Sequence, residues 1–445
     1  MKNLTEGNIY KNFIVFAIPM VLSGMFSQLY TTVDTVIVGR YLGSDGLAAL
    51  GATTDLLTFL CSIFWGYSGG ASIYAAKLFG AGEYKKLKNI VYNNVMLNVS
   101  AAVVVAVVVT VFCDPILDVL KVDTAIRAQA KTYMLVYVWG IGLITLHTVF
   151  VHTMQALGSG NFQFFMSLIS AVLNVAGNIF TITVLHWGVA GVVLSTVFSA
   201  FVVDICFAVK LKQCFKELGV NKHPFHLDVK SIREPFVIGG INMLQQMVLY
   251  LSALLISPMI NGIGSSATAG YVIAKKVYSI NTGIYQNSAK TVSNYTAQCV
   301  GAGKTRKIKK GLYVGWMQGM LLFVPVLLLC VIFAKPVCGL FLSESGDMAA
   351  FDYAMLFVRF FLPFVVVDML NNLFHAFFRG TSSMKLLFMS SFTGAVAQLV
   401  LTYLLRGYGM PGVYLAWILG WLTEAIFAVS AYLAGWWKKY CGYKD

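Results

Sequence analysis

Long apolar stretches recur along the whole chain, and this recurrence limits the fold more than any other feature of the sequence. A helix of about 20 apolar residues crosses the hydrocarbon core of a bilayer, which is roughly 30 Å thick. The 445-residue chain is 58% hydrophobic and only 11% charged, whereas a soluble domain carries about 25% charged residues. The strict alternation of a membrane β-barrel is absent. The sequence therefore predicts an all-α polytopic membrane protein.

Twelve transmembrane helices are expected, in two lobes of six helices each. The first lobe is residues 1–209, a polar cytoplasmic linker is residues 210–234, and the second lobe is residues 235–445. The expected spans cover residues 13–38, 50–76, 90–112, 132–155, 162–184, 188–209, 235–260, 266–297, 312–333, 353–377, 384–404 and 410–434.

Basic residues cluster in short loops after every second expected span, and they produce the net charge of +14. Loops rich in Lys and Arg stay on the cytoplasmic side of a membrane. We therefore expect a multi-pass protein of the cytoplasmic (inner) membrane, with both termini in the cytoplasm and no nucleic-acid partner. The clusters are Lys85, Lys86 and Lys88; Lys210, Lys212, Lys216, Lys222, Lys230 and Arg233; Lys304, Arg306, Lys307, Lys309 and Lys310; and Lys438 and Lys439.

The two halves of the chain resemble each other at a nearly constant offset of about 221 residues. For example, Gly80-Ala81-Gly82 corresponds to Gly301-Ala302-Gly303, and Gly188 corresponds to Gly409. Because each half has an even number of spans, the halves enter the membrane from the same side. We expect them to be related by a pseudo-two-fold axis along the membrane normal, as in transporters that bind substrate between two lobes.

One acid, Asp34, lies within the first apolar stretch. A charge near the middle of a membrane helix costs at least about 2.5–3.5 kcal/mol on insertion scales. A bound cation, a proton or a protein-lined cavity offsets that cost. Two simpler readings are hydration at the membrane interface and a structural ion pair with Arg40.

A set of short motifs runs in order through nearly the whole chain. They are Pro19, Val33-Asp34-Thr35, Gly39, GSDGLAA at 43–49, GAGE at 80–83, GVAG at 188–191, GAGK at 301–304 and Arg379-Gly380. In this order they resemble the multidrug and toxic compound extrusion (MATE) family. The resemblance implies a twelve-helix, two-lobe fold and cation-coupled antiport of drug-like, often cationic, organic molecules.

The resemblance also implies a cation-coupling site in the first lobe. Its residues match Asp34 on the first span, Asn174 and Asn178 on the fifth, and Thr196 on the sixth. Some family members have aspartate where this chain has Asn178, so one negative charge is missing here. The coupling ion is therefore either a proton, which the single acid favours, or a sodium ion at Asp34, Asn174 and Asn178.

A second family site pairs a seventh-span glutamate with a tenth-span aspartate. Asp368 matches the aspartate, but residues 235–343 contain no acid, and Gln245 and Gln246 occupy the neighbourhood of the glutamate. Asp368, Asn371, Asn372 and His375 form a polar stripe on the tenth span. Such a stripe suits substrate binding or proton relay; a structural hydrogen-bond network is the alternative.

The expected substrate cavity combines this stripe with polar residues from other spans. Span eight is unusually polar, and its lysines favour an anionic or zwitterionic substrate over a cationic one. The full set of cavity residues is Tyr137, Gln245, Gln246, Lys275, Lys276, Asn281, Tyr285, Asp368, Asn371, Asn372, His375 and Glu424.

No catalytic motif was found, and the cytoplasmic loops are too short for a catalytic domain. The eight cysteines are scattered singly and predict packing residues. We therefore expect no enzyme, no catalytic residue and no cofactor besides the coupling ion. The predicted function is a monomeric, cation-coupled antiporter that exports an organic small molecule by alternating access, with Asp34 as coupling acid. A flippase for a lipid-linked saccharide is the alternative.

Overall fold

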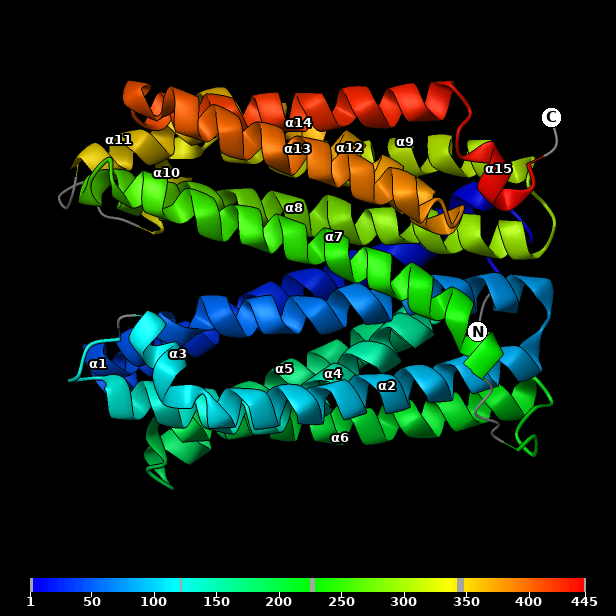
Figure 1. Cartoon of the computed structure of the whole chain (residues 1–445), viewed down its shortest axis with the longest axis horizontal. Coiled ribbons are helices and arrows are strands. Elements are labelled where there is room, and N and C mark those ends of the chain that lie inside the picture. Colours follow the sequence, from blue (N-terminus) through cyan, green and yellow to red (C-terminus); the bar gives the residue numbers. More distant parts are fainter. Residues whose placement is uncertain (1–2, 121, 225–228, 342–347, 444–445) are drawn as a thin grey trace. The chain divides into compact units, whose positions relative to one another are not determined.

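The computed structural model describes residues 3–120, 122–224, 229–341 and 348–443. Nearly all of these residues are helical, and none of them forms a β-strand (Figure 1). The predicted all-α polytopic fold is therefore confirmed. Part of the predicted linker, residues 225–228, lies outside the described residues.

Eleven helices in the described part of the chain are long and apolar enough to cross a membrane. Two of them, Ile9–Gly43 and Ala48–Ala81, together form α1 (Ile9–Ala81). Six more are α2 (Tyr84–Val111), α4 (Arg127–Ala156), α5 (Gly160–Thr183), α6 (Gly188–Glu217), α9 (Lys307–Ile332) and α14 (Met410–Leu433). The other three are Arg233–Asn261, within α7 (Val229–Asn261); Met348–Gly380, which contains α11 (Met348–Leu356) and α12 (Val365–Gly380); and Met384–Tyr408, which contains α13 (Met384–Leu405).

The twelfth expected span is α8 (Ser265–Gly301), which is long enough but too polar to meet the same hydropathy criterion. Most of its polar side chains, including Asn281, Thr291 and Gln298, are buried inside the protein. Since protein surrounds them, these groups need no water or lipid contact. Short helices α3 (Cys113–Val119), α10 (Ala334–Gly339) and α15 (Lys438–Cys441) complete the element order.

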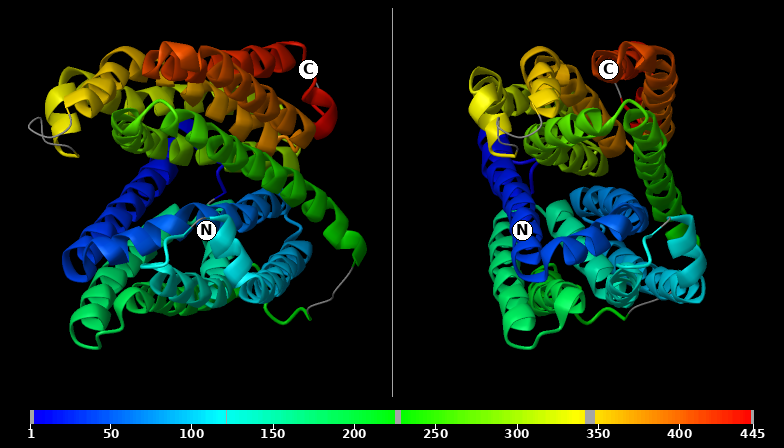
Figure 2. Two further views of the ribbon diagram at one scale, coloured as in Figure 1. Left: turned by 60° about the vertical axis from the view of Figure 1, so that its left-hand side comes forward. Right: turned by 90° about the vertical axis from the view of Figure 1, so that its left-hand side faces the viewer.

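Two helices are interrupted where the chain carries Gly or Pro. Helix α1 bends at Gly43, whose φ of 71° and ψ of −165° are not helical and suit a residue without a Cβ. Figure 2 shows the two lengths of α1 meeting at an angle. In the tenth span a π-helical turn, Phe357–Phe361, precedes Pro363, which cannot donate a backbone hydrogen bond.

The chain packs into two compact units, and α1 and α7 each contribute one segment to either unit. Unit 1 contains Leu22–Met243, and unit 2 contains Leu4–Val21 together with Leu244–Asp445. The first part of α1 therefore packs with the second repeat, and the first part of α7 packs with the first repeat. The lobe boundaries at residues 209 and 235 stay a prediction.

In unit 1, α4 packs against α2 and α6, and α6 packs against α5. The beginning of α7 lies against α1 at a seam of glycines. A Cβ on Gly70 would lie 2.7 Å from the Cα of Gly239, so only glycine allows the two backbones to approach this closely. Asn242 of α7 donates to the carbonyl oxygen of Gly66 at 2.6 Å.

In unit 2, α8 packs against α9 and α12, and α13 packs against α14. The N-terminal segment joins this unit, because the backbone N–H of Leu4 donates to Gln298 at 2.9 Å and the Phe13 ring lies 5.1 Å from that of Tyr295. Buried aromatic residues, among them Phe357 and Tyr414, fill the core.

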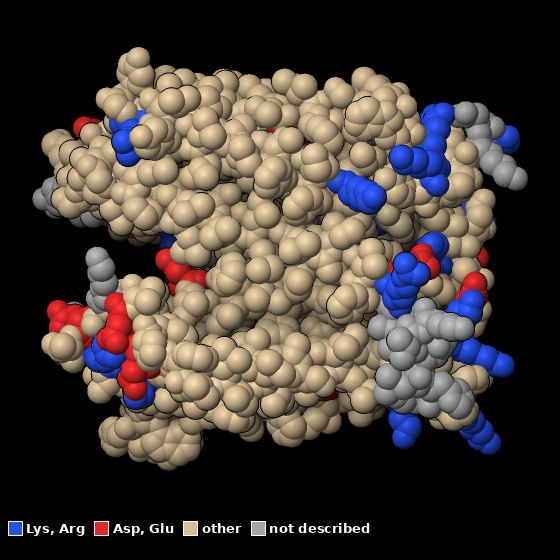
Figure 3. Space-filling model, in the orientation of Figure 1, with Lys and Arg blue, Asp and Glu red and all other residues tan. Residues whose placement is uncertain are grey.

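Charged side chains of unit 1 gather at the ends of its helices. In Figure 3 the acidic groups lie over the α3 end, and basic groups lie at the end where α7 begins. At the α3 end, Asp118 pairs with Arg127 at 2.5 Å, and Asp114 pairs with Lys131 at 2.7 Å.

Candidate functional site

Asp34 of α1 lies half-buried against α5. The side-chain N–H of Asn178 donates to Oδ1 of Asp34 at 2.5 Å. Asn178 is fully buried, and Asn174, one helical turn before it, is 1% exposed. Arg40, the ion-pair partner considered from the sequence, is exposed, and no pair between it and Asp34 occurs among the described residues. The polar partners of Asp34 are therefore neutral amides.

Asn174 extends the group to α6. In the amide orientation that satisfies every neighbour, its nitrogen donates to Oδ1 of Asp34 at 2.7 Å and its oxygen accepts from Thr196 at 3.0 Å. The structure thus brings together the four residues named from the sequence for cation coupling. They come from three helices of unit 1 and contain one charged group.

The chemistry of this group suits a single positive charge. Two amide N–H groups stabilise the carboxylate form of Asp34. Among the described residues no cluster of three or more His, Cys, Asp or Glu side chains occurs that suits a metal ion. The Oδ1 atom of Asn178 is buried and has no hydrogen-bond partner in the described structure, so it is one oxygen that can face a cation or a protonated carboxyl group.

A second polar group surrounds Asp368 in unit 2. Asp368 is 7% exposed and accepts hydrogen bonds from the hydroxyl groups of Tyr278, at 2.7 Å, and Tyr285. The amide of Asn372 donates to Oδ1 of Asp368 at 3.2 Å. Three donors therefore stabilise one buried acid of α12, and two of them come from α8.

The next turns of α12 reach a second buried acid, Glu424 of α14. His375 Nε2 lies 3.0 Å from Oε1 of Glu424, and Asn371 donates to Oε2 at 3.2 Å. Ser390 of α13 lies 3.3 Å from the same imidazole nitrogen. The polar stripe predicted on the tenth span therefore faces the interior of unit 2.

Of the other predicted cavity residues, Gln245 joins the group around His375, because its partner Ser391 lies 3.4 Å from the imidazole nitrogen Nε2 of His375. Gln245 donates to Ser391 at 2.9 Å, and Gln246 is half-buried. Asn281 is buried and donates to the carbonyl oxygen of Val277, whereas Lys275 and Lys276 are exposed. Tyr137 lies in unit 1, where its hydroxyl is 3.3 Å from the sulfur of Cys61.

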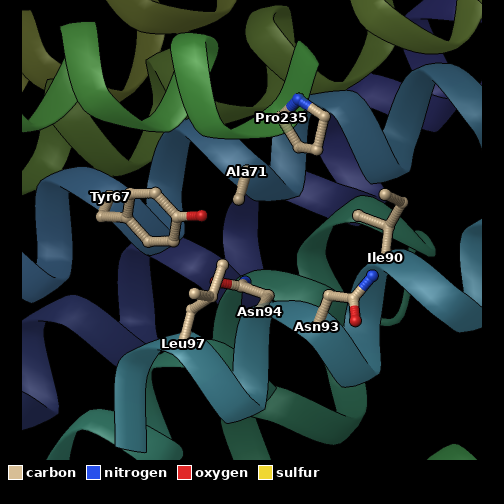
Figure 4. A pocket seen from close by; sticks show the side chains of 7 residues that line it. All are labelled: Tyr67, Ala71, Ile90, Asn93, Asn94, Leu97 and Pro235. Carbon is tan, nitrogen blue, oxygen red and sulfur yellow. The ribbon is translucent and has the colours of Figure 1, made fainter. Parts of the chain in front are cut away.

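A small pocket lies elsewhere in unit 1, between α1, α2 and α7. Figure 4 shows the side chains that line it, among them Tyr67 of α1, Asn93 and Asn94 of α2, and Pro235 of α7. Asn93 is 4% exposed, and neither of its amide atoms has a hydrogen-bond partner in the described structure. The pocket suits a small polar molecule such as water.

Three kinds of residue in these groups were not selected from the sequence. Tyr278, Ser390 and Ser391 are not among the predicted cavity residues, although they contact Asp368 or His375. Asp204 is also buried, because α6 continues past residue 209, the expected end of the sixth span, as far as Glu217. Hydropathy alone does not predict the extra helical length, because that part of α6 contains Lys and Gln residues.

Comparison with known proteins decides the family. The MatE family model matches residues 19–180 and 242–404, which together make up most of the chain. The chain belongs to the MatE family. The resemblance found from the ordered motifs is therefore confirmed, and the protein is a multi-pass membrane protein of a transporter family.

Relatives of this MatE protein include the probable multidrug resistance protein YoeA of Bacillus subtilis (strain 168), which is 24% identical and is matched over 77% of this chain and 76% of its own length. The multidrug export protein MepA of Staphylococcus aureus (strain N315) is 21% identical over 96% of this chain and 93% of its own length. Neither name favours the flippase alternative.

Solved structures of the family show the same fold. A multidrug resistance MATE family transporter of the MOP superfamily in an outward-facing conformation matches with a TM-score of 0.90 and 18% identity, covering 98% of both chains. A MOP superfamily transporter from Pyrococcus furiosus matches with a TM-score of 0.88 and 18% identity over 97% of this chain and 96% of its own. The expected twelve-helix, two-lobe layout is that of the family.

Proposed function

We propose that this MatE protein is a cation-coupled antiporter that exports organic, drug-like molecules across the cytoplasmic membrane by alternating access, with Asp34 as the coupling acid. The observation that carries the proposal is the convergence of Asp34, Asn174 and Asn178 inside unit 1. The names of the relatives, which refer to multidrug resistance and export, support the substrate class.

The coupling ion in this proposal is a proton. With both amide nitrogens facing Asp34, the carboxylate is stabilised by donors, whereas a sodium ion binds oxygen atoms. Sodium binding at Asp34, Asn174 and Asn178 requires both amides to turn their oxygens inward. A proton requires one amide at most to turn and accept from the new O–H group. Sodium is therefore the alternative coupling ion, and the experiment below distinguishes it from the proton.

Coupling follows from the different charge of the two forms of Asp34. The charged carboxylate holds α1 to α5 through two amide donors, and neutralisation weakens those hydrogen bonds. Because the ion binds two conformations of unit 1 with different affinity, its gradient favours one conformation over the other. The lipid bilayer is the surrounding partner, and we propose that the antiporter acts as a monomer with both termini in the cytoplasm.

The test is transport by inside-out vesicles under separately imposed proton and sodium gradients. Ethidium and an anionic fluorescent dye serve as probes, because the exposed lysines of α8 favour an anionic substrate. We expect proton-driven uptake of at least one dye by the wild type and loss of gradient-driven uptake in Asp34→Asn. The matched control is Asp55→Asn, an exposed acid on the same helix. Wild-type uptake by Asp34→Asn contradicts the proposed role of Asp34.

A further inference from the structure

A buried histidine–carboxylate pair joins α4 to α6 within unit 1, apart from the coupling group. The Nδ1 atom of His147 lies 2.9 Å from Oδ1 of Asp204. The Asp204 side chain is 4% exposed, whereas that of His147 is 26% exposed. The carboxylate is therefore enclosed by protein, and the imidazole is the part of the pair that a proton can reach.

A cluster of aromatic rings packs beside the imidazole of the pair. The Phe207 ring lies 5.6 Å from the imidazole of His147 in an edge arrangement, and Phe150 and Phe162 pack around Phe207. The second carboxylate oxygen of Asp204, Oδ2, is buried without a hydrogen-bond partner in the described structure. The pair thus lies in an environment with few groups that can stabilise a net charge.

Several helices that pack near the pair carry other titratable groups. Helix α5 carries none, and His147 is the titratable side chain that contacts Asp204. Lys210 lies beyond Phe162, with its nitrogen 6.0 Å from that ring. The remaining groups on α2, α3, α4 and α6 are Tyr84, Lys85, Lys86, Lys88, Tyr92, Cys113, Asp114, Asp118, Arg127, Lys131, Tyr133, Tyr137, His152, Cys206, Lys212, Cys214, Lys216 and Glu217.

We propose that His147 and Asp204 form a proton-binding site separate from Asp34. With a neutral imidazole, the pair has a net charge of −1 and leaves a buried carboxylate without a compensating cation. One proton added to the imidazole gives a neutral ion pair, and no other bond changes. Since a lone buried charge costs several kcal/mol after relaxation, the protonated pair is the favoured state in this packing.

The second repeat carries the same kind of pair between the same two of its spans. His375 belongs to the fourth span of that repeat and Glu424 to the sixth, and their nitrogen and oxygen are 3.0 Å apart. His147 and Asp204 likewise belong to the fourth and sixth spans of the first repeat. Packing of the fourth against the sixth span through a histidine and an acid therefore occurs twice in this fold.

The experiment follows the imidazole signals of full-length protein labelled with ¹⁵N-histidine, in nanodiscs, as the pH is raised. His147→Gln assigns the signal, and the pH of every sample is measured directly. We expect His147 to bind its proton at least tenfold more tightly in the wild type than in Asp204→Asn, a midpoint difference of about one pH unit. Asp204→Glu keeps the carboxylate and is expected to retain most of the effect.

Two titration results overturn the pairing of His147 with Asp204, and a third overturns its separation from Asp34. One is a wild-type His147 that is already neutral at about pH 5, a pH at which an ordinary histidine is protonated. This result counts against the inference even if Asp204→Asn does not fold. The other is an equal midpoint in the wild type and Asp204→Asn. The Asp34→Asn variant must leave the His147 titration unchanged, since a shift there shows that the two sites are one. None of these readouts depends on transport, so a failed antiport assay leaves the inference testable.

Discussion

Asn178 donates a hydrogen bond to Asp34 over 2.5 Å, although the two residues are 144 positions apart in the sequence. This contact fixes α5 against the first part of unit 1 and presents a neutral amide where some MATE members have an acid. The charge of the group is therefore set by Asp34 alone, and changing either residue alters the charge that the site can balance.

Replacing Asn178 with aspartate is expected to favour sodium. Two unit charges about 4 Å apart attract by about 4 kcal/mol at an effective dielectric constant of about 20, and one third of that is tenfold in affinity. We expect Asn178→Asp to bind ²²Na⁺ at least tenfold more tightly than the wild type. Asn261→Asp, at the exposed end of α7, adds the same charge elsewhere and serves as control. Equal sodium binding in wild type and Asn178→Asp refutes this account.

The glycine seam between α1 and α7 gives a prediction about stability. A Cβ on Gly239 would lie 2.9 Å from the backbone oxygen of Tyr67, whereas a Cβ on Gly240 meets nothing within 4 Å. Overpacking of this kind costs about 1–3 kcal/mol. We expect Gly239→Ala to lower the unfolding midpoint in detergent and Gly240→Ala to leave it unchanged or raise it. The seam is unimportant if the two variants unfold alike.

The hydroxyl group of Tyr285 contributes to the stability of unit 2 through Asp368. Hydrogen bonds in membranes average about 0.6 kcal/mol, and those to charged groups in soluble proteins reach about 1.5–3 kcal/mol. We expect Tyr285→Phe to cost about 1 kcal/mol in the free energy of unfolding, and much less when Asp368→Asn is already present. Tyr313→Phe, at an exposed tyrosine, is the control. Equal losses in both backgrounds argue against a bond between these two groups.

The ion pairs at the α3 end give a dependence on pH. Lys131 donates to both carboxylate oxygens of Asp114 at 2.9 and 2.7 Å, and this hydrogen bond is the main cause that lowers the pKa of Asp114. A depressed pKa stabilises the fold above the unfolded value of about 3.9 and ceases to do so as the pH falls through the folded pKa. In ¹³C carboxyl titrations Lys131→Met should move the pKa of Asp114 upward. An unchanged titration shows that the pair does not persist in solution.

Eleven of the twelve expected spans were predictable from apolar length, whereas α8 is too polar to be marked by apolar length alone. Gly43 ends the first length of α1 at the place that the sequence indicated as a loop. The end of α6 was wrong by about two turns, since Lys212 and Gln213 continue the helix without being apolar. The π-helical turn before Pro363 left no recognisable signal, because its phenylalanines and Val358 also suit a regular helix.

The candidate site was predictable only in part. The spacing of Asn174 and Asn178 placed both amides on one helix face, and the structure shows them on the same carboxylate. Which helix faces which cannot be read from spacing, so Tyr278 was not identified as a partner of Asp368. The same limit hid the pairing of His147 with Asp204.

The division of α1 after Val21 and of α7 after Met243 has a consequence for biogenesis. Fragments made by cutting the chain between its repeats each lack one helical segment of their own core and carry one that belongs to the other. A ribosome that has finished the first six spans has therefore not yet made everything unit 1 contains. Completion of either unit waits for the seventh span, which makes assembly of the two repeats interdependent during synthesis.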